Sequence, residues 1–317
     1  MNAILVASDL NMLLTNKLKL EGNIHSVFEH AVNILTNDNF FITILTIERD
    51  ISPMSIIIKE NNFLAIDFKV GQEVLITKKK IQIINSEFEI ILTNSKEWNF
   101  NIFSKSKYIS LKNYKKNIQL FEKTLIKYGN SNGILPIVFE VDAINIKSKL
   151  NKPFIASNHY SVFIKERVNE FLKQFINFDE NIFPLLIKKI IGFGPGLTPS
   201  IDDFLSGLMI MSIHLARYFE LDTTKIKRIN RLIYTSSLEK TTKVSEEMLK
   251  NSMNEKSSLG FLNVIKSILY ESNLDTEKTI LEAIKYGDTS GSDFLLGVLT
   301  AINLFENENI RRNFIND

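Results

Sequence analysis

The pattern of hydrophobic residues changes its period near residue 113, and this change constrains the fold more than any other feature of the sequence. Before it, short β-branched and aromatic runs alternate with turn-like stretches such as Glu60-Asn61-Asn62. Such runs are typical of strands. They lie at residues 40–47, 55–58, 63–68, 74–76, 81–84 and 88–92. Short strands at this close spacing predict a small antiparallel barrel or sandwich.

After residue 113, apolar residues recur at three- and four-residue steps, as they do on one face of a helix. Ile118, Phe121 and Leu125 form the first such series, and Gly129 follows it as a stop signal. Further helices are predicted at residues 162–175, 183–191, 201–219, 224–238, 245–253, 259–270, 276–286 and 292–305. Residues 134–141 fit either a strand or an irregular connection. The sequence therefore predicts an α+β protein, with a β-rich domain over residues 1–112 and a mainly α-helical domain over residues 113–317.

The composition excludes several classes of protein. The 317 residues include no cysteine, which rules out disulfides, thiolate metal sites and a catalytic thiol. Lys and Arg number 38 against 36 Asp and Glu, a balance that does not favour nucleic-acid binding. The N-terminus lacks a secretory pattern, and the longest apolar stretch, near Phe204 to Leu215, is too short and too polar to span a bilayer. We therefore expect a soluble cytoplasmic protein with no membrane or nucleic-acid partner.

Two segments of the helical half repeat each other. The shared pattern is S-x-x-D-F-L-x-G, which begins at Ser200 and again 90 residues later at Ser290. A glycine-bearing loop precedes each copy, and four of the chain's 12 glycines fall between residues 192 and 207. The first loop is neither a Walker A sequence nor a dinucleotide fingerprint. The repeat indicates either a duplicated packing unit or a duplicated site.

Each copy of the repeat looks like the start of a helix. A serine at the N-cap with aspartate three residues later, as in Ser200 and Asp203, predicts a capping box. The glycines at 207 and 297 would let another helix approach closely. Capping and packing explain these residues without any ligand. They do not explain the glycine-rich loop ahead of the first copy, or the extra carboxylate of Asp202.

The first loop also predicts a binding site for a small anion. Gly194 and Gly196 can adopt positive φ and turn backbone N–H groups toward one point, where the helix dipole adds positive potential. We expect the hydroxyls of Thr198 and Ser200 to donate to the same anion. The predicted binding residues are Gly194, Gly196, Leu197, Thr198, Ser200, Asp202 and Asp203, with Thr289, Ser290 and Asp293 from the second copy.

No metal, cofactor or catalytic residue is assigned by the sequence. Adjacent helical side chains such as Asp202 and Asp203 point about 100° apart. We therefore expect Asp203 to cap the helix and Asp202 to face solvent or ligand, and Mg²⁺ is left as an alternative. Four histidines without cysteine argue against a transition-metal site. No Ser/His/Asp constellation can be assembled from the spacing.

The segment from Gly192 to Gly207 resembles the signature of the AllH (YlbF-like) family, G-x-G-x-G-L-T-P-S-G-D-D-F-L-x-G, and residues 287–297 look like that family's second element. The family is likewise organised with a β-rich N-terminal part and a helical C-terminal part. The resemblance implies a subunit of an oxamate carbamoyltransferase that works with FdrA-type and AllG-type subunits. In anaerobic allantoin (purine) catabolism such an enzyme would convert oxalurate and phosphate to oxamate and carbamoyl phosphate, which are all small anions.

One residue departs from the family's pattern. Ile201 stands where the family usually has glycine. We expect its branched side chain to narrow the approach to the helix start, which would affect the choice of substrate. Two alternatives stay open: a non-catalytic scaffold subunit of the same complex, and a carbamoyltransferase that acts on another ureido substrate.

Overall fold

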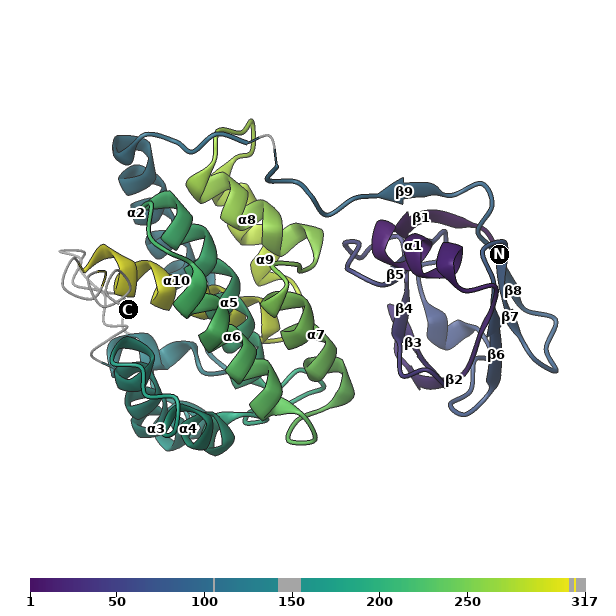
Figure 1. Cartoon of the computed structure of the whole chain (residues 1–317), viewed down its shortest axis with the longest axis horizontal. Helices are drawn as coiled ribbons and strands as arrows, with labels where there is room; N and C mark the ends of the chain where they lie inside the picture. The colour runs from purple at the N-terminus through teal and green to yellow at the C-terminus, as the bar shows by residue number, and fades with distance from the viewer. Residues whose placement is uncertain (105, 142–154, 308–310, 312–317) are drawn as a thin grey trace. The chain divides into compact units, whose positions relative to one another are not determined.

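The structure is a computed structural model, and it describes residues 1–104, 106–141, 155–307 and 311. Contacts within the chain divide it into two compact units: Met1–Lys105 with Ser257–Leu259, and Ser106–Lys256 with Gly260–Asp317. The strands lie in the first unit, and helices α2 to α10 belong mainly to the second (Figure 1). The fold class is therefore α+β, as predicted.

A single nine-stranded sheet makes up most of the first unit. Its strands are β1 (Ala3–Ala7), β2 (Leu20–Val27), β3 (Ala31–Thr36), β4 (Phe41–Leu45), β5 (Ser55–Ile58), β6 (Glu73–Ile76), β7 (Lys80–Ile83), β8 (Glu89–Ile91) and β9 (Lys96–Trp98). They are ordered β8-β7-β6-β2-β3-β4-β5-β1-β9. Helix α1 (Ser8–Asn16) follows β1 and buries Leu10 and Leu14, which lie one turn apart.

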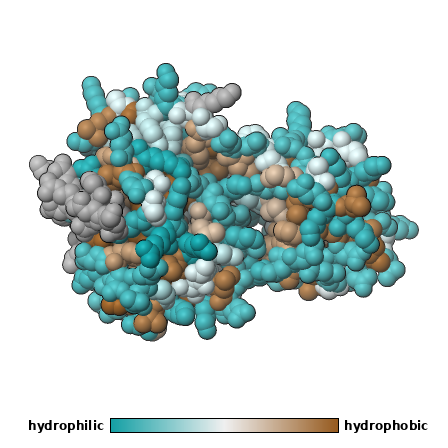
Figure 2. All heavy atoms as spheres, viewed as in Figure 1, coloured by the Kyte–Doolittle hydropathy of each residue, from teal (hydrophilic) through white to brown (hydrophobic). Residues whose placement is uncertain are grey.

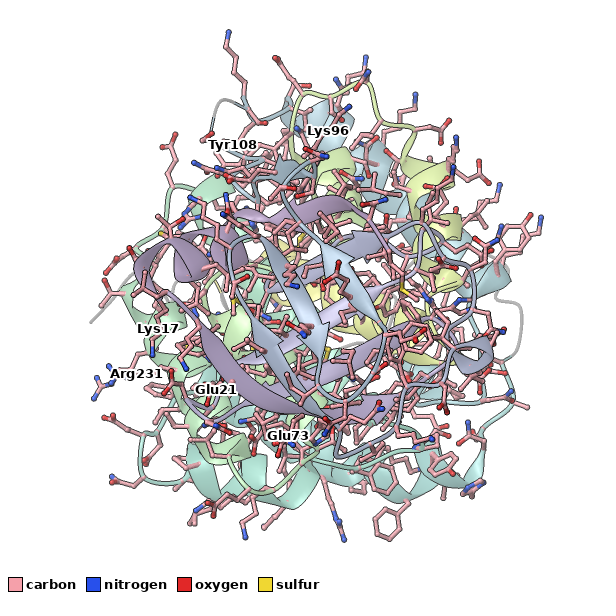
Figure 3. The ribbon with its side chains drawn as sticks, turned by 90° about the vertical axis from the view of Figure 1, so that its right-hand side faces the viewer. Lys17, Glu21, Glu73, Lys96, Tyr108 and Arg231 are labelled. Carbon is pink, nitrogen blue, oxygen red and sulfur yellow. The ribbon has the colours of Figure 1, made fainter. Side chains whose placement is uncertain are left out.

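The sheet curls until its edge strand β8 reaches the residues ahead of β1. Asn2 forms a bridge with Ile91, whose N–H donates to the Met1 carbonyl over 2.9 Å. Along β2, buried residues alternate with exposed ones, as expected for a strand with one face on a core. Exposed carboxylates on adjacent strands include Glu21 of β2 and Glu73 of β6 (Figure 3). This curled sheet confirms the predicted β-rich N-terminal region.

The strand predictions needed three corrections. Residues 63–68 are not a strand, because the Asn62 side chain accepts from the N–H of Leu64 (2.8 Å) and starts a short 3₁₀ helix, η1 (Phe63–Ala65). Strands β1, β2, β3 and β9 were not predicted. The sheet is also not purely antiparallel, since β4 pairs with β5, and β1 with β9, in parallel.

The second unit is built from helices. They are α2 (Leu111–Tyr128), η2 (Leu135–Phe139), α3 (His159–Ile176), α4 (Phe183–Ile190), α5 (Ser200–Tyr218), α6 (Thr224–Ser237), α7 (Lys243–Met253), α8 (Leu259–Leu269), α9 (Thr276–Ile284) and α10 (Ser290–Glu306). Residues 134–141, left open between strand and irregular connection, hold the 3₁₀ helix η2. The other predicted helices agree with these bounds to within a few residues.

Helices α5 and α10, which carry the two copies of the repeat, form the core of this unit. Nearly all their residues are buried on every side, which is typical of a helix surrounded by others. They cross at their second turns. A Cβ placed on Gly207 would lie 2.1 Å from the Phe294 carbonyl oxygen, and one on Gly297 would lie 2.0 Å from the Phe204 carbonyl oxygen. These reciprocal contacts confirm the predicted close approach at both glycines.

No helix in the described part of the chain is long and apolar enough to cross a membrane. The face seen in Figure 2 is mostly hydrophilic, with hydrophobic side chains scattered over it.

Candidate functional site

The glycine-rich loop connects α4 to α5 and lies at the surface of the helical unit. Pro195, Gly196 and Leu197 are exposed, whereas Pro199 and Ser200 at the helix start are buried. Gly194 has a φ of +123° and Gly196 a φ of +88°, in the region that favours glycine. Both glycines therefore adopt the positive φ expected of them.

Several backbone N–H groups of this loop are unused. Over the described residues, the N–H groups of Gly194, Gly196, Leu197, Thr198 and Ser200 donate no hydrogen bond within the protein. The next N–H groups along the chain are engaged, because Ile201 donates to the Phe193 carbonyl and Asp202 to the Pro199 carbonyl. The loop thus leaves a set of donors free directly ahead of α5.

A tertiary contact fixes the orientation of one of these donors. The Thr242 hydroxyl, at the start of α7, donates to the Leu197 carbonyl over 2.5 Å. In a trans peptide the carbonyl and the following N–H point in opposite directions. The N–H of Thr198 is therefore held pointing away from Thr242.

Neither helix start is a capping box, so that prediction is wrong. Helix α5 begins one residue and α10 two residues earlier than expected, with Pro199 and Thr289 as N-caps that make no side-chain cap. The carbonyl of Pro199 takes the first-turn donors, since it accepts from the N–H groups of both Asp202 and Asp203 (2.8 and 3.2 Å). Ser200 is the first helical residue, and Asp203 does not cap its own helix.

Asp202 faces the protein rather than solvent or ligand, contrary to expectation. Its side chain is fully buried and accepts from the Gly192 N–H (2.8 Å) and from the Thr241 hydroxyl. Burial raises the pKa of Asp202, while the Thr241, Gly192 and Ser245 donors oppose that rise. Asp202 therefore ties the beginning of the loop to the segment before α7. Both of its oxygens accept hydrogen bonds within the protein.

Ser292 stands in the second copy where Asp202 stands in the first, and it also holds a neighbouring segment against its helix. The Ser292 hydroxyl accepts from the Asn130 N–H (2.8 Å), and the Asn130 amide donates to the Asp288 carbonyl (2.9 Å). The segment after α2 is thereby attached to the start of α10.

Asp203 and Asp293 are buried where the two helix starts meet. Their side chains are 2% and 0% exposed, and one carboxylate oxygen of each, Oδ2, has no hydrogen-bond partner among the described residues. The other oxygen of Asp293 accepts from the Ile134 N–H (2.9 Å). A Cβ on Gly133 would lie 2.3 Å from Asp293 Oδ2, so this segment covers the carboxylate closely.

Burial and mutual repulsion shift the titration of both acids. Burial raises the pKa of Asp203 well above its usual range, and the charge of Asp293 raises it further, against the hydroxyls of Ser290 and Thr198. Burial raises the pKa of Asp293 to about 6, against the Ser200 hydroxyl, the Ile134 N–H and the Thr289 hydroxyl. Each aspartate thus faces the serine that begins the other helix.

A hydroxyl pair joins the two copies of the repeat. Thr198 Oγ1 and Ser290 Oγ lie 2.9 Å apart and share a hydrogen bond, and both residues are partly exposed. The structure therefore brings the two loops to one place. The N-terminal ends of α5 and α10 converge there, each with the equivalent of about half a positive charge.

The remaining predicted residues lie around this point. Leu197 is 45% exposed, Thr289 is buried beside Asp293, and the Ser200 hydroxyl is buried without a partner within hydrogen-bonding geometry. The Ile201 side chain is fully buried, and its effect on the approach to the helix start stays a prediction.

Sequence reasoning missed the residues that brace the loops. They are Asn130 and Ile134 after α2, and Thr241, Thr242 and Ser245 around the start of α7. Of these residues, only Thr242 could have been found from the local sequence, as the N-cap of α7. Its hydroxyl accepts from the Ser245 N–H.

Within the described ranges, no three His, Asp or Glu side chains gather around a point where a metal could bind. The geometry names no ligand, and the anion site stays a prediction.

Two family models match the chain. The AllH family N-terminal domain matches residues 2–97, and the oxamate carbamoyltransferase subunit AllH matches residues 190–302. The second match contains both copies of the repeat. Neither a curated protein nor a solved structure matches the sequence significantly. Since the two models together cover most of the chain, the protein belongs to the AllH family, whose name describes a subunit of an oxamate carbamoyltransferase.

Proposed function

We propose that this protein is the subunit of an oxamate carbamoyltransferase complex that supplies a small-anion site, at the loop from Gly194 to Ser200. In the proposed reaction, oxalurate and phosphate give oxamate and carbamoyl phosphate, as a step of anaerobic allantoin catabolism. FdrA-type and AllG-type subunits would complete the complex, in the cytoplasm. The family name supports the carbamoyltransferase assignment.

One observation carries the proposal: the unused N–H groups of the loop stand at the start of one buried helix and beside the start of another. Phosphate, carboxylate and the oxyanion of carbamoyl transfer all need such donors. Glycine N–H groups supply them without a side chain that would have to be reorganised. The partly exposed hydroxyls of Thr198 and Ser290 add two donors at the same place.

A second reading, a scaffold subunit without chemistry of its own, is favoured by apolar side chains at the rim of the loop. Phe163 of α3 is 55% exposed and stacks on Phe193 of the loop, with ring centroids 5.2 Å apart. Leu197 is also exposed. Exposed aromatic and aliphatic side chains of this kind are common in contacts between subunits. A carbamoyltransferase acting on another ureido substrate would use the same loop.

The double substitution of Gly196 by valine and Thr198 by alanine tests the anion site. Valine cannot adopt the φ of Gly196 without strain, so the N–H groups should move, and one hydroxyl is lost. We expect the affinity for inorganic phosphate to fall at least about tenfold, because a hydrogen bond to a charged group contributes about 1.5 to 3 kcal/mol. Isothermal titration of the purified chain measures the affinity, and turnover of the reconstituted complex measures the consequence.

Gly71→Val provides a matched control. Gly71 has a φ of +86° and open space around it, but it lies in the strand-rich unit. The control suffers the same backbone strain and should leave phosphate binding unchanged. Unchanged phosphate affinity and turnover in the double variant would remove the loop from the site and leave the scaffold reading.

A further inference from the structure

A line of polar groups runs from the buried interior to the glycine loop. Asp203 is almost completely buried, and its Oδ2 atom has no hydrogen-bond partner among the described residues. The hydroxyls of Ser290 and Thr198 lie close enough to this carboxyl group to lower its pKa. These two hydroxyls are hydrogen-bonded to each other at 2.9 Å and are partly exposed. Thr198 belongs to the loop that carries the unused N–H groups.

We propose that Asp203, acting through the hydroxyls of Ser290 and Thr198, exchanges a proton with the ligand held by the glycine loop. This inference rests on the proposed anion site. A hydroxyl both donates and accepts, so two of them in series can pass a proton, whereas the N–H groups of the loop only donate. Asp203 is thus a positioning residue that supplies the proton, and Thr198 is the group that meets the ligand.

The proton balance of carbamoyl transfer from a ureido compound fits such a relay. A phosphate oxygen forms a bond to the carbamoyl carbon, and the bond from that carbon to the leaving nitrogen breaks. The nitrogen takes a proton from Thr198, which recovers one from Asp203 through Ser290. The hydroxyl proton of the attacking phosphate returns to Asp203 along the same path. No proton is gained or lost overall, and no further reactant is needed.

The charged groups around Asp203 suit it to this role. The charges of Asp293 in α10 and Asp202 in α5 both raise the pKa of Asp203. The charge of Asp288 likewise raises the pKa of Asp293. All three charges favour protonated carboxyl groups. Asp293 accepts from the Ile134 N–H, which favours its ionised form. The pair is therefore divided into one carboxyl group that holds its proton, Asp203, and one that ionises more readily, Asp293.

Asn substitutions at the two aspartates test the relay, because they keep the shape of the side chain. In the reconstituted complex, Asp203→Asn should lower turnover about 100-fold or more and remove one limb of the pH profile. Phosphate affinity of the chain alone should change less than about threefold, since the loop N–H groups are untouched. Asp293→Asn removes a neighbouring negative charge, so the same limb should be kept but displaced to lower pH.

A second pair of variants keeps the test decisive if Asp203→Asn fails to fold. Thr198→Val should lose turnover in the same way as Asp203→Asn, and Thr198→Ser, which keeps a hydroxyl, should restore it. An unchanged pH profile in Asp203→Asn, or activity in Thr198→Val equal to that of Thr198→Ser, overturns the relay while leaving the anion site standing. Loss of the anion site itself would appear separately, as unchanged phosphate affinity in the Gly196→Val, Thr198→Ala variant.

Discussion

Gly207→Ala is expected to lower the free energy of unfolding of the helical unit by about 3 kcal/mol or more, although alanine is the better helix former. The added Cβ would lie 2.1 Å from the carbonyl oxygen of Phe294, a backbone atom in the second turn of α10. A side chain could rotate away from such a contact, but a carbonyl engaged in a helix cannot. The two central helices would have to move apart over the whole crossing. Gly297→Ala should have a similar effect, because its contact with Phe204 is the reciprocal one.

Urea unfolding followed by circular dichroism at 222 nm measures this loss for the helical unit. The only tryptophan, Trp98, lies in β9, so its fluorescence follows the strand-rich unit and serves as an internal reference. Gly71→Ala is the control, because it adds a methyl group into open space at positive φ and should cost only about 1 kcal/mol. If Gly207→Ala stabilised the protein by the roughly 1 kcal/mol that helix propensity alone predicts, the close crossing would be wrong.

Asp293→Asn is expected to stabilise the protein at pH 7 and above, and to have little effect at pH 4. Burial raises the pKa of Asp293 to about 6 in the folded protein, from a usual value of 3.8. At low pH both the folded and the unfolded chain carry the proton. As the pH rises, the unfolded chain ionises first, and the folded protein loses stability until its own pKa is passed. A shift of about two pH units corresponds to about 3 kcal/mol.

The asparagine variant cannot ionise, so it avoids this penalty. Its side-chain oxygen can still accept from the Ile134 N–H, which limits other losses. Urea unfolding of both proteins between pH 4 and pH 8 should therefore give curves that separate as the pH rises. Asp222→Asn is a control of opposite sign, because the Thr224 N–H and hydroxyl lower the pKa of the exposed Asp222. If the free energies of unfolding of wild type and Asp293→Asn changed in parallel with pH, ionisation of Asp293 would not lower the stability of the folded protein.

Local patterns predicted the helices and the more apolar strands, since these elements bury runs of neighbouring residues. Strand β4 and helix α2 are examples, because β4 is a continuous β-branched and aromatic run and α2 shows a helical period of its own. Strand β2 was missed because its buried face carries few apolar side chains, with Gly22 between Leu20 and Ile24. Residues 63–68 are predicted as a strand because they form an apolar run. The Asn62 side chain instead accepts a local hydrogen bond from the Leu64 N–H, which starts a 3₁₀ helix.

At the site, the positive φ of Gly194 and Gly196 and the close helix approach followed from the motif, but the meeting of the two loops and the roles of the aspartates did not. Asp202 finds its partner in Thr241 and Asp293 in Ile134, which are 39 and 159 residues away along the chain. A sequence motif cannot specify partners brought in by tertiary folding. The capping-box pattern failed for a related reason, since Pro199 supplies its carbonyl to the first turn and leaves Asp203 to face the other helix.

The reciprocal contacts between Gly207, Phe294, Gly297 and Phe204 have a mechanical consequence for the site. Each helix is held at its second turn by the backbone of the other, so neither can slide or tilt without breaking the opposite contact. The spacing between the first residues of the two helices, Ser200 and Ser290, is therefore set by the interior of the unit. The segments that precede the helices lie outside this crossing, so a ligand can be admitted there without moving either helix.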